Sequence, residues 1–459
     1  MTSRRQLITA TGVAAGGALL IGGTGAIASA ATAPKPAADP WTQVPVILGR
    51  IKPPTFPAKD FPVTSYGAKG DGTTDNTAAF AKAIKACSTG GGGRVTVPAG
   101  KWLTGAIELL DNVNLNLASD ATILFSTDTR KYPVVLTRWQ GIECMNFSPL
   151  IHAEGRTNIA ITGSGTLDGQ GAAWKPFGGG GSDWTNLQKQ GANNTPVSKR
   201  MYGPGHKLRP AMIEPRNCRN ILIDGVTILR PPMWSIHPVL SSNITVSNVT
   251  IDSRNGGGNN DGCDPECCND VHIVNTKFTT GDDCIAIKSG RDTDGRRVNI
   301  PSQNIVIENC DFIFSNRGAI CVGSEVSGGA NNIFAQNCRV NPAGRSGQLW
   351  YMLFVKTGNK RGGVIDGIHL RNITGNKLTQ SALYVTMTYG NSGPGPTVNP
   401  TLQNITADHI TVTGAGGYGL EVIGLAASHA KHIHVTNSTF SGLGKGTVHA
   451  TNADDVTVK

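Results

Sequence analysis

A short pattern of alternating apolar and polar residues recurs along this 459-residue chain. A polar residue, often Asn, precedes an apolar-x-apolar run. The pattern starts at Asn220, Asn243, Asp270, Asn304, Asn332, Gly367 and Lys431. Such alternation predicts short strands that bury one face. The first six starts lie 23, 27, 34, 28 and 35 residues apart, which suits the coils of a solenoid, some of them with inserted loops.

Repeated strands without intervening helices favour a parallel β-helix over other solenoids. The Leu-x-Leu signature of leucine-rich repeats does not recur along the chain. We therefore expect an all-β parallel β-helix that occupies residues 59–459. The stretch Asp75–Ile84 has apolar residues at helical spacing and predicts a helical cap at the N-terminal end of the stack, because an open-ended stack needs one.

Two kinds of feature interrupt or accompany the strand pattern. Glycine-rich excursions at about Trp174–Arg209 and Asn391–Pro400 predict long loops that wall a groove along the solenoid. We expect Asn or Cys residues at equivalent turns to form internal ladders. The three cysteines concerned are Cys218, Cys310 and Cys338, and each directly follows an Asn.

The N-terminus differs in composition from the rest of the chain. Residues 1–30 contain Arg4-Arg5, a weakly apolar stretch and the end Ala28-Ser29-Ala30, features of a twin-arginine export signal. A membrane anchor is the alternative. Residues 31–58 are rich in Ala and Pro and predict a linker and extended lead-in. We expect a secreted or periplasmic monomer that is free of the membrane once the signal is removed.

The charge balance is moderately basic. The full chain carries +10, and without the two signal arginines it carries 39 − 31 = +8. A positive balance favours an anionic partner. Lys and Arg are scattered along the sequence, and no run of basic residues with aromatic residues between them occurs. Nucleic acid is therefore not the expected partner.

The chain contains ten cysteines, of which Cys263, Cys267, Cys268 and Cys284 crowd together. Clustered thiolates can bind zinc, but two separated C-x-x-C pairs are absent. We expect a disulfide or buried thiols here, and no metal or other cofactor.

The densest chemical signal is a pair of acidic segments. Asn259-Asn260-Asp261 is followed by Gly281-Asp282-Asp283, and Asp261 lies 21 and 22 residues before the two later acids. One coil has about that length, so the segments should stack on adjacent coils ~4.8 Å apart. Carboxylates this close raise at least one pKa. The cluster suits glycoside hydrolysis, which needs one protonated and one ionised carboxyl group; a Ca²⁺ site or a structural turn ladder is the alternative.

These motifs give the chain a specific resemblance. It resembles glycoside hydrolase family 28, the polygalacturonase family, over roughly residues 60–440. Asn259-Asn260-Asp261 matches the family's N-x-D motif and Gly281-Asp282-Asp283 its G/Q-D-D motif. Other similar segments are Tyr66–Gly72, Asp168–Gly171, Arg209-Pro210, Pro232–Pro238 and Gly323-Ser324-Glu325. The resemblance implies a right-handed parallel β-helix, an inverting mechanism, no metal and an acidic, galacturonate-containing pectic substrate.

The resemblance also implies roles for the acids. Asp282 would protonate the glycosidic oxygen, while Asp261 and Asp283 would hold and deprotonate the water. Neighbours on a regular strand face opposite ways, so Asp282 and Asp283 reach one cleft only if the chain bends near Gly281.

Two further family motifs are altered. Arg317 stands where the family's G-H-G histidine falls, and Phe354 replaces the arginine of R-I-K, whereas Lys356 retains its lysine. We expect Arg317 one coil beyond the acids, and we expect Arg317 and Lys356 to bind an acidic sugar. Trp234, His237 and Arg209 are further candidates for sugar binding.

Two other functions remain compatible with these residues. A polysaccharide lyase on the same fold would use Ca²⁺ and a basic residue and would form an unsaturated product. A non-catalytic carbohydrate-binding β-helix would bind pectin without cutting it.

Overall fold

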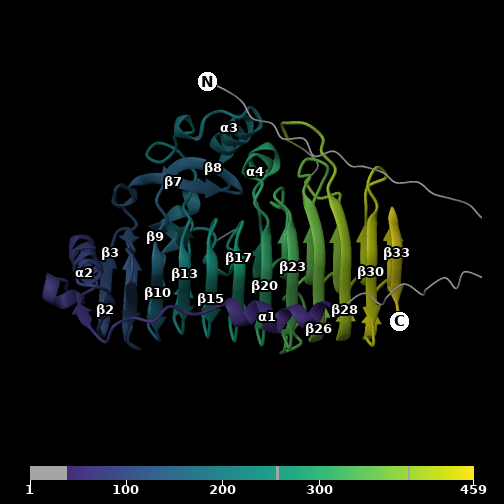
Figure 1. Ribbon diagram of the computed structural model, residues 1–459, viewed down its shortest axis with the longest axis horizontal. Coiled ribbons are helices and arrows are strands. Elements are labelled where there is room, and N and C mark those ends of the chain that lie inside the picture. The colour runs from purple at the N-terminus through teal and green to yellow at the C-terminus, as the bar shows by residue number, and fades with distance from the viewer. Residues whose placement is uncertain (1–38, 255–257, 391–392) are drawn as a thin grey trace, which may run out of the picture. The chain divides into compact units, whose positions relative to one another are not determined.

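The computed structural model describes residues 39–254, 258–390 and 393–459. Residues from Pro40 to Lys459 form one compact unit. Its strands stand side by side in chain order along the long axis (Figure 1). The twin-arginine signal predicted for residues 1–30 lies outside the described residues. In the part of the chain that is described, no helix is long and apolar enough to span a membrane.

Four α-helices, five short 3-10 helices and thirty-three strands make up this unit within the described residues. The α-helices are α1 (Gln43–Arg50), α2 (Thr77–Thr89), α3 (Gly181–Ala192) and α4 (Asp292–Val298). The largest sheet contains β1 (Asp60–Pro62), β2 (Gly93–Val97), β3 (Gly100–Thr104), β5 (Val113–Leu117), β6 (Ala121–Phe125), β10 (Thr157–Gly163), β11 (Thr166–Asp168), β13 (Arg219–Asp224), β14 (Thr227–Leu229), β15 (Ser242–Ser247), β16 (Thr250–Asp252), β17 (Asn269–Val274), β18 (Lys277–Thr279), β20 (Ser302–Glu308), β21 (Asp311–Phe314), β23 (Ala330–Gln336), β24 (Arg339–Val340), β26 (Val364–Leu378), β28 (Thr401–Ala415), β30 (Ala430–Thr436), β31 (Thr439–Leu443) and β33 (Ala453–Val458).

The remaining strands form three smaller sheets. A six-stranded sheet contains β19 (Ile285–Ile287), β22 (Gly318–Gly323), β25 (Tyr351–Lys356), β27 (Leu383–Thr386), β29 (Tyr418–Ile423) and β32 (Gly446–Thr451). A three-stranded sheet contains β4 (Ile107–Glu108), β9 (Ile151–Glu154) and β12 (Ile213–Arg216). The antiparallel hairpin of β7 (Val134–Trp139) and β8 (Ile142–Phe147) lies apart from the coil.

All seven predicted strand units occur in the structure and stack in parallel register. Ile221 of β13 pairs with Ile244 of β15, which pairs with Val271 of β17, and the same column continues through Ile305 and Ile333. These side chains are buried and form one continuous core. The stacking confirms the parallel β-helix that the alternating pattern predicts.

An asparagine ladder holds one corner of the coils. Asn112, Asn158, Asn220 and Asn243 all have a left-handed backbone, with φ between 54° and 61°, which Asn tolerates better than most residues. The side-chain amides of Asn158, Asn220 and Asn243 each donate to the amide oxygen of the asparagine one coil below, over 2.9, 2.9 and 2.6 Å. The ladder therefore satisfies polar groups that the turns would otherwise leave unpaired.

The cysteines are buried thiols. All ten are free and buried. The Sγ atoms of Cys218, Cys310 and Cys338 donate to the backbone carbonyl two residues earlier, over 3.1, 3.4 and 3.2 Å. These three positions thus have the structural role that their spacing predicts, and the disulfide alternative does not occur.

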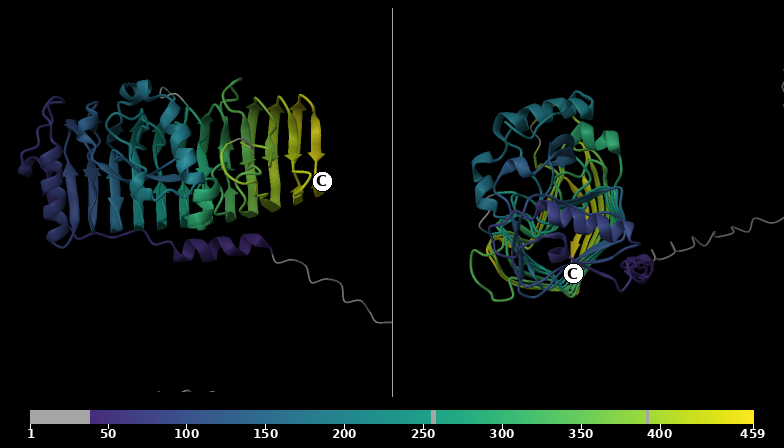
Figure 2. Two further views of the ribbon diagram at one scale, coloured as in Figure 1. Left: turned by 90° about the horizontal axis from the view of Figure 1, so that it is seen from above. Right: turned by 90° about the vertical axis from the view of Figure 1, so that its left-hand side faces the viewer.

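Helix α2 covers the N-terminal end of the stack (Figures 1 and 2). Its residues Phe80, Ala83 and Ile84 are buried in the main core, and the Asp75 carboxylate accepts a hydrogen bond from the Thr77 amide at 3.0 Å. The predicted helical cap is present and runs five residues further than the pattern indicates.

Residues 31–58 are not simply extended where the structure describes them. Helix α1 lies along the outside of the largest sheet (Figure 2) and buries Val44, Ile47 and Ile51 against Val306 and Phe334. Its apolar positions recur at intervals of three and four residues, a helical spacing that the Ala and Pro content of the segment obscures.

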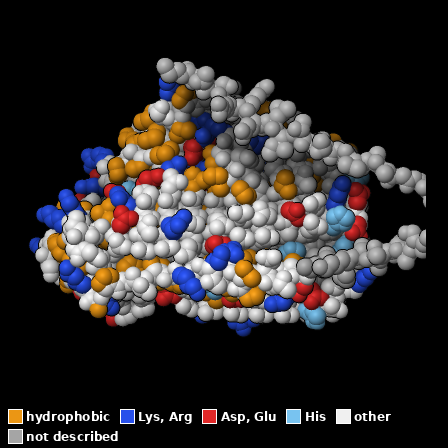
Figure 3. Space-filling model, in the orientation of Figure 1, with side chains coloured by type: hydrophobic (Ala, Val, Ile, Leu, Met, Phe, Trp, Pro, Cys, Tyr) orange, Lys and Arg blue, Asp and Glu red, His pale blue; other side chains and the backbone are white. Residues whose placement is uncertain are grey.

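The surface charges are mixed. On the face shown in Figure 3, Lys and Arg side chains lie interspersed with Asp and Glu, as their scatter along the sequence indicates.

Stacked aromatic residues provide a test of the core. Phe278 and Phe312 are fully buried on adjacent coils, with ring centroids 5.3 Å apart. We expect Phe278→Ala to lower the free energy of unfolding by about 3–5 kcal/mol, because it removes buried area and leaves a cavity. The matched control is Ile313→Ala, next to Phe312 but 37% exposed, which should change it by less than about 1 kcal/mol. Urea denaturation measures both, and equal losses would contradict this description of the core.

Candidate active site

Asp261 and Asp283 occupy equivalent positions on adjacent coils. The residues two places later, Cys263 and Ile285, pair in parallel register. The amide of Gly262 also donates to the carbonyl of Asp283 at 3.0 Å. The 22-residue spacing therefore corresponds to one coil, as predicted.

Asp282 and Asp283 lie in a turn rather than on a strand. Strand β18 ends at Thr279 and β19 begins at Ile285. The hydroxyl groups of Thr280 and Ser315 donate to the Asp282 carbonyl over 2.6 and 2.7 Å and hold this turn. The bend predicted near Gly281 is thus present, and it lets both carboxylates reach the same cleft.

The three predicted acids meet in space. One carboxylate oxygen from each of Asp261, Asp282 and Asp283 lies within 4.8 Å of the other two. The Asp282 Oδ2 atom accepts a hydrogen bond from the Asn259 amide at 3.1 Å. Asp261 and Asp283 are buried, whereas Asp282 is partly exposed to the cleft.

Gly262 allows the coil that carries Asp261 to pack closely on the next one. A Cβ atom at this position would lie 2.6 Å from the Phe278 ring and 2.5 Å from the Cys284 carbonyl oxygen. Only glycine fits there without displacing the turn that carries Asp261.

Two buried lysines neutralise the acid cluster. Lys356 Nζ lies 2.5 Å from Asp283 Oδ2, and the nearby carboxylate raises the pKa of this lysine although burial opposes the shift. Lys288 Nζ lies 3.6, 3.7 and 3.2 Å from carboxylate oxygens of Asp261, Asp264 and Glu325. The cluster is therefore a mixed network of charges and not an isolated set of carboxylates.

Burial makes two of the acids unusually basic. It raises the pKa of Asp261 well above the ordinary value, and the neighbouring Asp264 adds to the shift. Burial likewise raises the pKa of Asp264, to about 8, although Lys288 opposes it. Glu325 behaves differently: burial alone would raise its pKa, but Lys288 and Arg291 hold it well below its usual range.

The carboxylates open into a cleft of about 330 Å³. Of the predicted sugar-binding residues, Trp234, Arg317 and Lys356 line it. The other lining residues include Gln140, Asn259, Lys288, Arg291, Ser324, Glu325 and Tyr389. Gln140 comes from the turn of the β7–β8 hairpin and Tyr389 from the segment after β27, so the cleft has walls from distant parts of the chain.

Arg317 lies one coil beyond the acids, as predicted. The Gly318 carbonyl oxygen accepts a hydrogen bond from the Cys284 amide at 2.9 Å, which places Gly318 beside Asp283 and Arg317 beside Asp282. The Arg317 guanidinium stacks on the Trp350 ring, 4.5 Å from its centroid.

His237 does not reach the cleft, which corrects its prediction as a sugar-binding residue. Its side chain is fully buried, and its Nδ1 and Nε2 atoms lie 3.0 and 2.8 Å from carboxylate oxygens of Glu214 and Glu266. Burial alone would lower the pKa of His237, but these two acids raise it. Both ring nitrogens are occupied, so His237 belongs to the scaffold beneath the β7–β8 hairpin.

Arg209 and Trp234 lie beside the acids with little exposure. Arg209 is 4% exposed and donates to the Gly258 carbonyl oxygen. Burial lowers the pKa of this guanidinium, while Asp261 and Asp282 act in the opposite direction. Trp234 is 2% exposed, and Lys288 Nζ lies 4.5 Å from its ring centroid. Both residues support the charged floor of the cleft more than they present a surface to a sugar.

Sequence reasoning missed Lys288, Arg291 and Tyr389. Lys288 follows the strand Ile285–Ile287 and pairs in register with Glu266 on the previous coil, so its place beside the acids of that coil could have been predicted from the 22-residue spacing. Arg291 depends on the tertiary fold: it donates to Glu325 at 2.7 Å and lies 4.9 Å from the Trp184 ring of α3.

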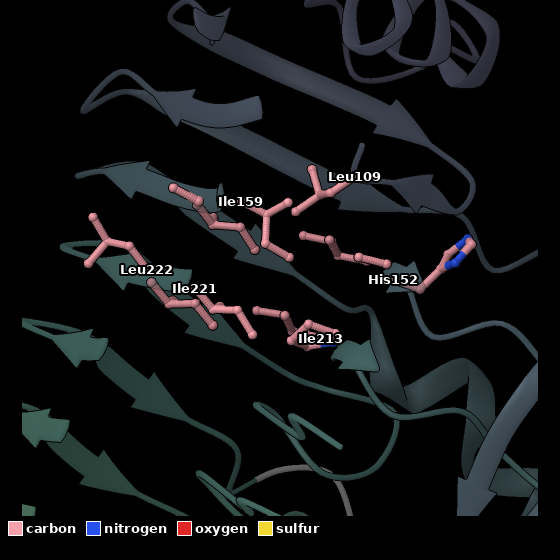
Figure 4. Close-up of a pocket in the computed structure, with 12 residues that line it drawn as sticks. Leu109, His152, Ile159, Ile213, Ile221 and Leu222 are labelled. Carbon is pink, nitrogen blue, oxygen red and sulfur yellow. The ribbon is translucent and has the colours of Figure 1, made fainter. Parts of the chain in front are cut away.

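Two other hollows lack a comparable set of groups. The small hollow in Figure 4 has a volume of about 10 Å³. Apolar side chains such as Ile159, Ile213 and Ile221 line it, and His152 lies at its edge. A larger hollow of about 270 Å³ is lined by Glu108, His152, Glu154, Glu214 and Arg216 among others, but Arg216 already pairs with Glu154 at 2.9 Å.

The acid cluster could also hold a cation, because hard divalent ions prefer carboxylate oxygens. However, Lys356 already supplies a positive charge at Asp283, and Lys288 supplies one near Asp261. The geometry therefore supports proton transfer between carboxyl groups and a bound sugar better than it supports a metal centre.

Comparisons with known proteins agree with this geometry. The family model described as Glycosyl hydrolases family 28 matches residues 87–458. A probable polygalacturonase from Vitis vinifera is 33% identical over 75% of this chain and 66% of its own length. An exo-poly-alpha-D-galacturonosidase from Dickeya chrysanthemi is 29% identical over 86% of this chain and 68% of its own length. The alignments thus span about two thirds of these relatives.

Solved structures show the same fold. The crystal structure of a hyperthermoactive exopolygalacturonase from Thermotoga maritima matches with a TM-score of 0.84 and 35% identity, over 90% of this chain and 95% of that chain. A polygalacturonase from Erwinia carotovora matches with a TM-score of 0.62 and 19% identity, over 89% of this chain and 98% of that chain.

The ion pair between Lys356 and Asp283 provides a test of the site. Lys356→Met keeps the length of the side chain but leaves the buried Asp283 carboxylate uncompensated. We expect the free energy of unfolding to fall by about 3–5 kcal/mol. The matched control is Arg254→Met, which breaks the exposed pair with Asp252 at 2.7 Å and should cost less than about 1 kcal/mol. Similar losses for both variants, measured by urea denaturation, would refute the assigned burial of this pair.

Proposed function

This chain belongs to glycosyl hydrolases family 28, and we propose that it hydrolyses an α-linked galacturonan from one end of the polymer. The observation that carries the proposal is the cluster of Asp261, Asp282 and Asp283 within 4.8 Å, beside buried lysines. Relatives named polygalacturonase or exopolygalacturonase supply the substrate class.

The proposed mechanism divides the acids by their surroundings. Asp282 faces the cleft and protonates the glycosidic oxygen as the bond breaks. Asp261 and Asp283 hold a water molecule on the other side of the sugar. Asp261 removes a proton from this water, and its raised pKa makes it a stronger base than an ordinary aspartate once it is ionised. Lys356 holds the neighbouring Asp283 carboxylate in place through a hydrogen bond of 2.5 Å.

Direct attack of this water inverts the anomeric centre. Inverting pairs usually stand roughly 6.5–9.5 Å apart, whereas the nearest oxygens of the acid cluster lie within 4.8 Å. Asp282 and Asp261 must therefore hold the water with their more distant oxygens, or separate slightly when the sugar enters. The stereochemistry of the product consequently tests the mechanism directly.

Two cations support an acidic sugar as the substrate. Arg317 and Lys356 both line the cleft, one from the coil next to Asp283 and one from the following coil. A charge-assisted contact with a uronate carboxylate contributes about 1.5–3 kcal/mol. Because Lys356 forms an ion pair with Asp283, it can contact the uronate carboxylate only while it also contacts Asp283.

The walls of the cleft support attack at a chain end. The β7–β8 hairpin contributes Gln140, and the approach to α4 contributes Arg291. The segment near Gly395 joins this wall, because Lys360 Nζ donates to the Gly395 carbonyl oxygen at 2.9 Å and Arg296 donates to the Lys360 and Arg361 carbonyl oxygens. The two glycine-rich excursions support this wall from outside, because Trp184 lies 4.9 Å from Arg291 and Gly395 lies beside Thr293 of α4. A cleft walled in this way suits a pocket for a terminal sugar.

The place of action is also a proposal. Arg4-Arg5 and the Ala28-Ser29-Ala30 end support export by a twin-arginine-type signal, so the polymer would be cut outside the cytoplasm. A galacturonan of that kind occurs in pectin-type polysaccharides.

Digestion of polygalacturonate tests the proposed function. We expect small galacturonides from the first minutes, while the viscosity of the polymer falls slowly, because each cut removes only a chain end. Proton NMR of the earliest product should show the β anomer. An unsaturated product that absorbs ultraviolet light would instead indicate a lyase, and binding without new reducing ends would indicate a carbohydrate-binding protein.

Substitution of the proposed acid tests its role. Asp282→Asn keeps the shape of the side chain and removes its ionisable proton, so kcat should fall by at least about 10²–10⁴-fold while substrate still binds. The matched control is Asp252→Asn, at an exposed carboxylate that pairs with Arg254, which should retain parental kcat. Activity of Asp282→Asn within threefold of the parent would rule out this role.

A further inference from the structure

Three aromatic side chains form a continuous surface next to the cleft. Tyr351 and Phe354 belong to β25, and Tyr384 belongs to β27 on the next coil. Their ring centroids lie 4.5, 5.3 and 5.5 Å apart, and the Phe354 and Tyr384 rings are tilted by only 11°. We refer to Tyr351, Phe354 and Tyr384 as the aromatic platform.

The platform begins where the catalytic cleft ends. Tyr351 pairs in register with Gly318, which lies one coil beyond Asp283, so it is two coils, or about 9.6 Å, from the acids. Lys356 Nζ lies 4.8 Å from the Phe354 ring centroid, and the cleft residue Tyr389 contacts the same ring edge-on at 5.9 Å. A sugar chain that leaves the cleft toward the C-terminal coils therefore meets these rings.

The rings differ in what they can offer a ligand. Phe354 is 3% exposed and forms the floor, whereas Tyr351 and Tyr384 are partly exposed. Burial, with smaller contributions from Tyr384 and Glu421, raises the pKa of Tyr351 to about 12, so its ring stays neutral. The flat faces of neutral aromatic rings bind the C–H faces of sugars.

Charge changes sign along the platform. Arg317 borders it on the side of the acids, where it lies on the Trp350 ring. Glu421 pairs in register with Tyr384 on the far side, and Ser381 Oγ donates to its Oε2 atom at 2.5 Å. A second free uronate over Tyr384 would therefore face a carboxylate, which disfavours its binding.

We propose that the aromatic platform is a sugar-binding subsite for a ring without a free carboxylate, next to the subsite that holds the galacturonate to be cut. The class of ligand is an uncharged pyranose, which is either a methyl-esterified galacturonate or a neutral sugar of the same polymer. This inference rests on the proposed function for the direction in which the sugar chain leaves the cleft. The binding of the uncharged ring to the platform does not depend on that function.

The experiment compares oligosaccharides of equal length that differ in the charge of their rings, with a digalacturonate as the short reference. The substrates are a digalacturonate that fills only the cleft, a longer oligogalacturonide, its methyl-esterified form, and an oligosaccharide in which galacturonate alternates with rhamnose. The parent protein should have a higher kcat/KM on the methyl-esterified form, on the alternating oligosaccharide or on both than on the unesterified oligogalacturonide of equal length. The methyl ester or the alternating chain, whichever is preferred, identifies the source of the uncharged ring.

Variants of Tyr384 connect the preference to the platform. Tyr384→Ala should raise KM for the preferred long substrate about threefold to tenfold, with kcat and the hydrolysis of digalacturonate unchanged. Tyr384→Phe keeps the ring and should behave as the parent. Tyr384→Arg should move the preference toward the free acid. The matched control is Tyr418→Ala, on the same sheet face but stacked on His449 at 5.1 Å, and it should leave every substrate unaffected.

Two results would overturn the inference. One is a parent that prefers the free acid at equal length, and the other is a folded Tyr384→Ala variant with parental KM on all long substrates. If the parent cleaves digalacturonate but either result appears, only the platform assignment fails. If the parent cleaves no galacturonide, the proposed function fails, and the affinities of the parent and Tyr384→Ala for the uncut oligosaccharides still decide the platform.

Discussion

The register between adjacent coils is the constraint on which the site depends. Parallel pairing connects Ile236, Cys263 and Ile285 in one column, and this column sets the positions of the residues two places before each of them. A slip of one residue would turn the side chains of a strand to its other face and would separate Asp261 from Asp283. The buried side chains of the core, the asparagine ladder and the close approach at Gly262 all oppose such a slip.

The register also explains which features could be predicted from the sequence. The spacing of Asn220, Asn243 and Asn304 repeats with the coil, so the strands, their stacking and the meeting of the three acids follow from counting residues. His237 could not be placed in this way. Its partner Glu266 forms an ion pair with Arg138 at 3.0 Å. Arg138 lies 128 residues before Glu266, on a hairpin outside the coil. The β7–β8 hairpin does not follow the period of the coils, so its contacts cannot be predicted from the spacing of the strands.

The acid cluster illustrates how a stable scaffold accommodates costly groups. Buried charges need partners of opposite charge, because otherwise nothing offsets the free-energy cost of removing them from water. Lys288, directly after β19, and Lys356, at the end of β25, supply these partners from coils that lie two apart in the same sheet. Asp264 extends the network below the cleft and Glu325 extends it along the cleft lining, so the acids that face the substrate rest on a layer of balanced charge. Hydrophobic residues would pack there at lower cost, and their absence fits the principle that local rules are broken where function requires it.

Helix α1 brings a segment near one end of the sequence against the middle of the coil. Arg50 pairs with Asp270, 220 residues later, at 2.6 Å, and the Lys52 amide donates to Asn243 at 2.8 Å. Val306 and Phe334 complete its docking surface. Because closing so long a loop is entropically costly and contacts of high sequence separation form slowly, this helix can settle only after the coils that carry β15 to β23 have been built. Helix α1 is therefore among the last of the described parts to reach its native place, and its docking reports that the middle of the solenoid is complete.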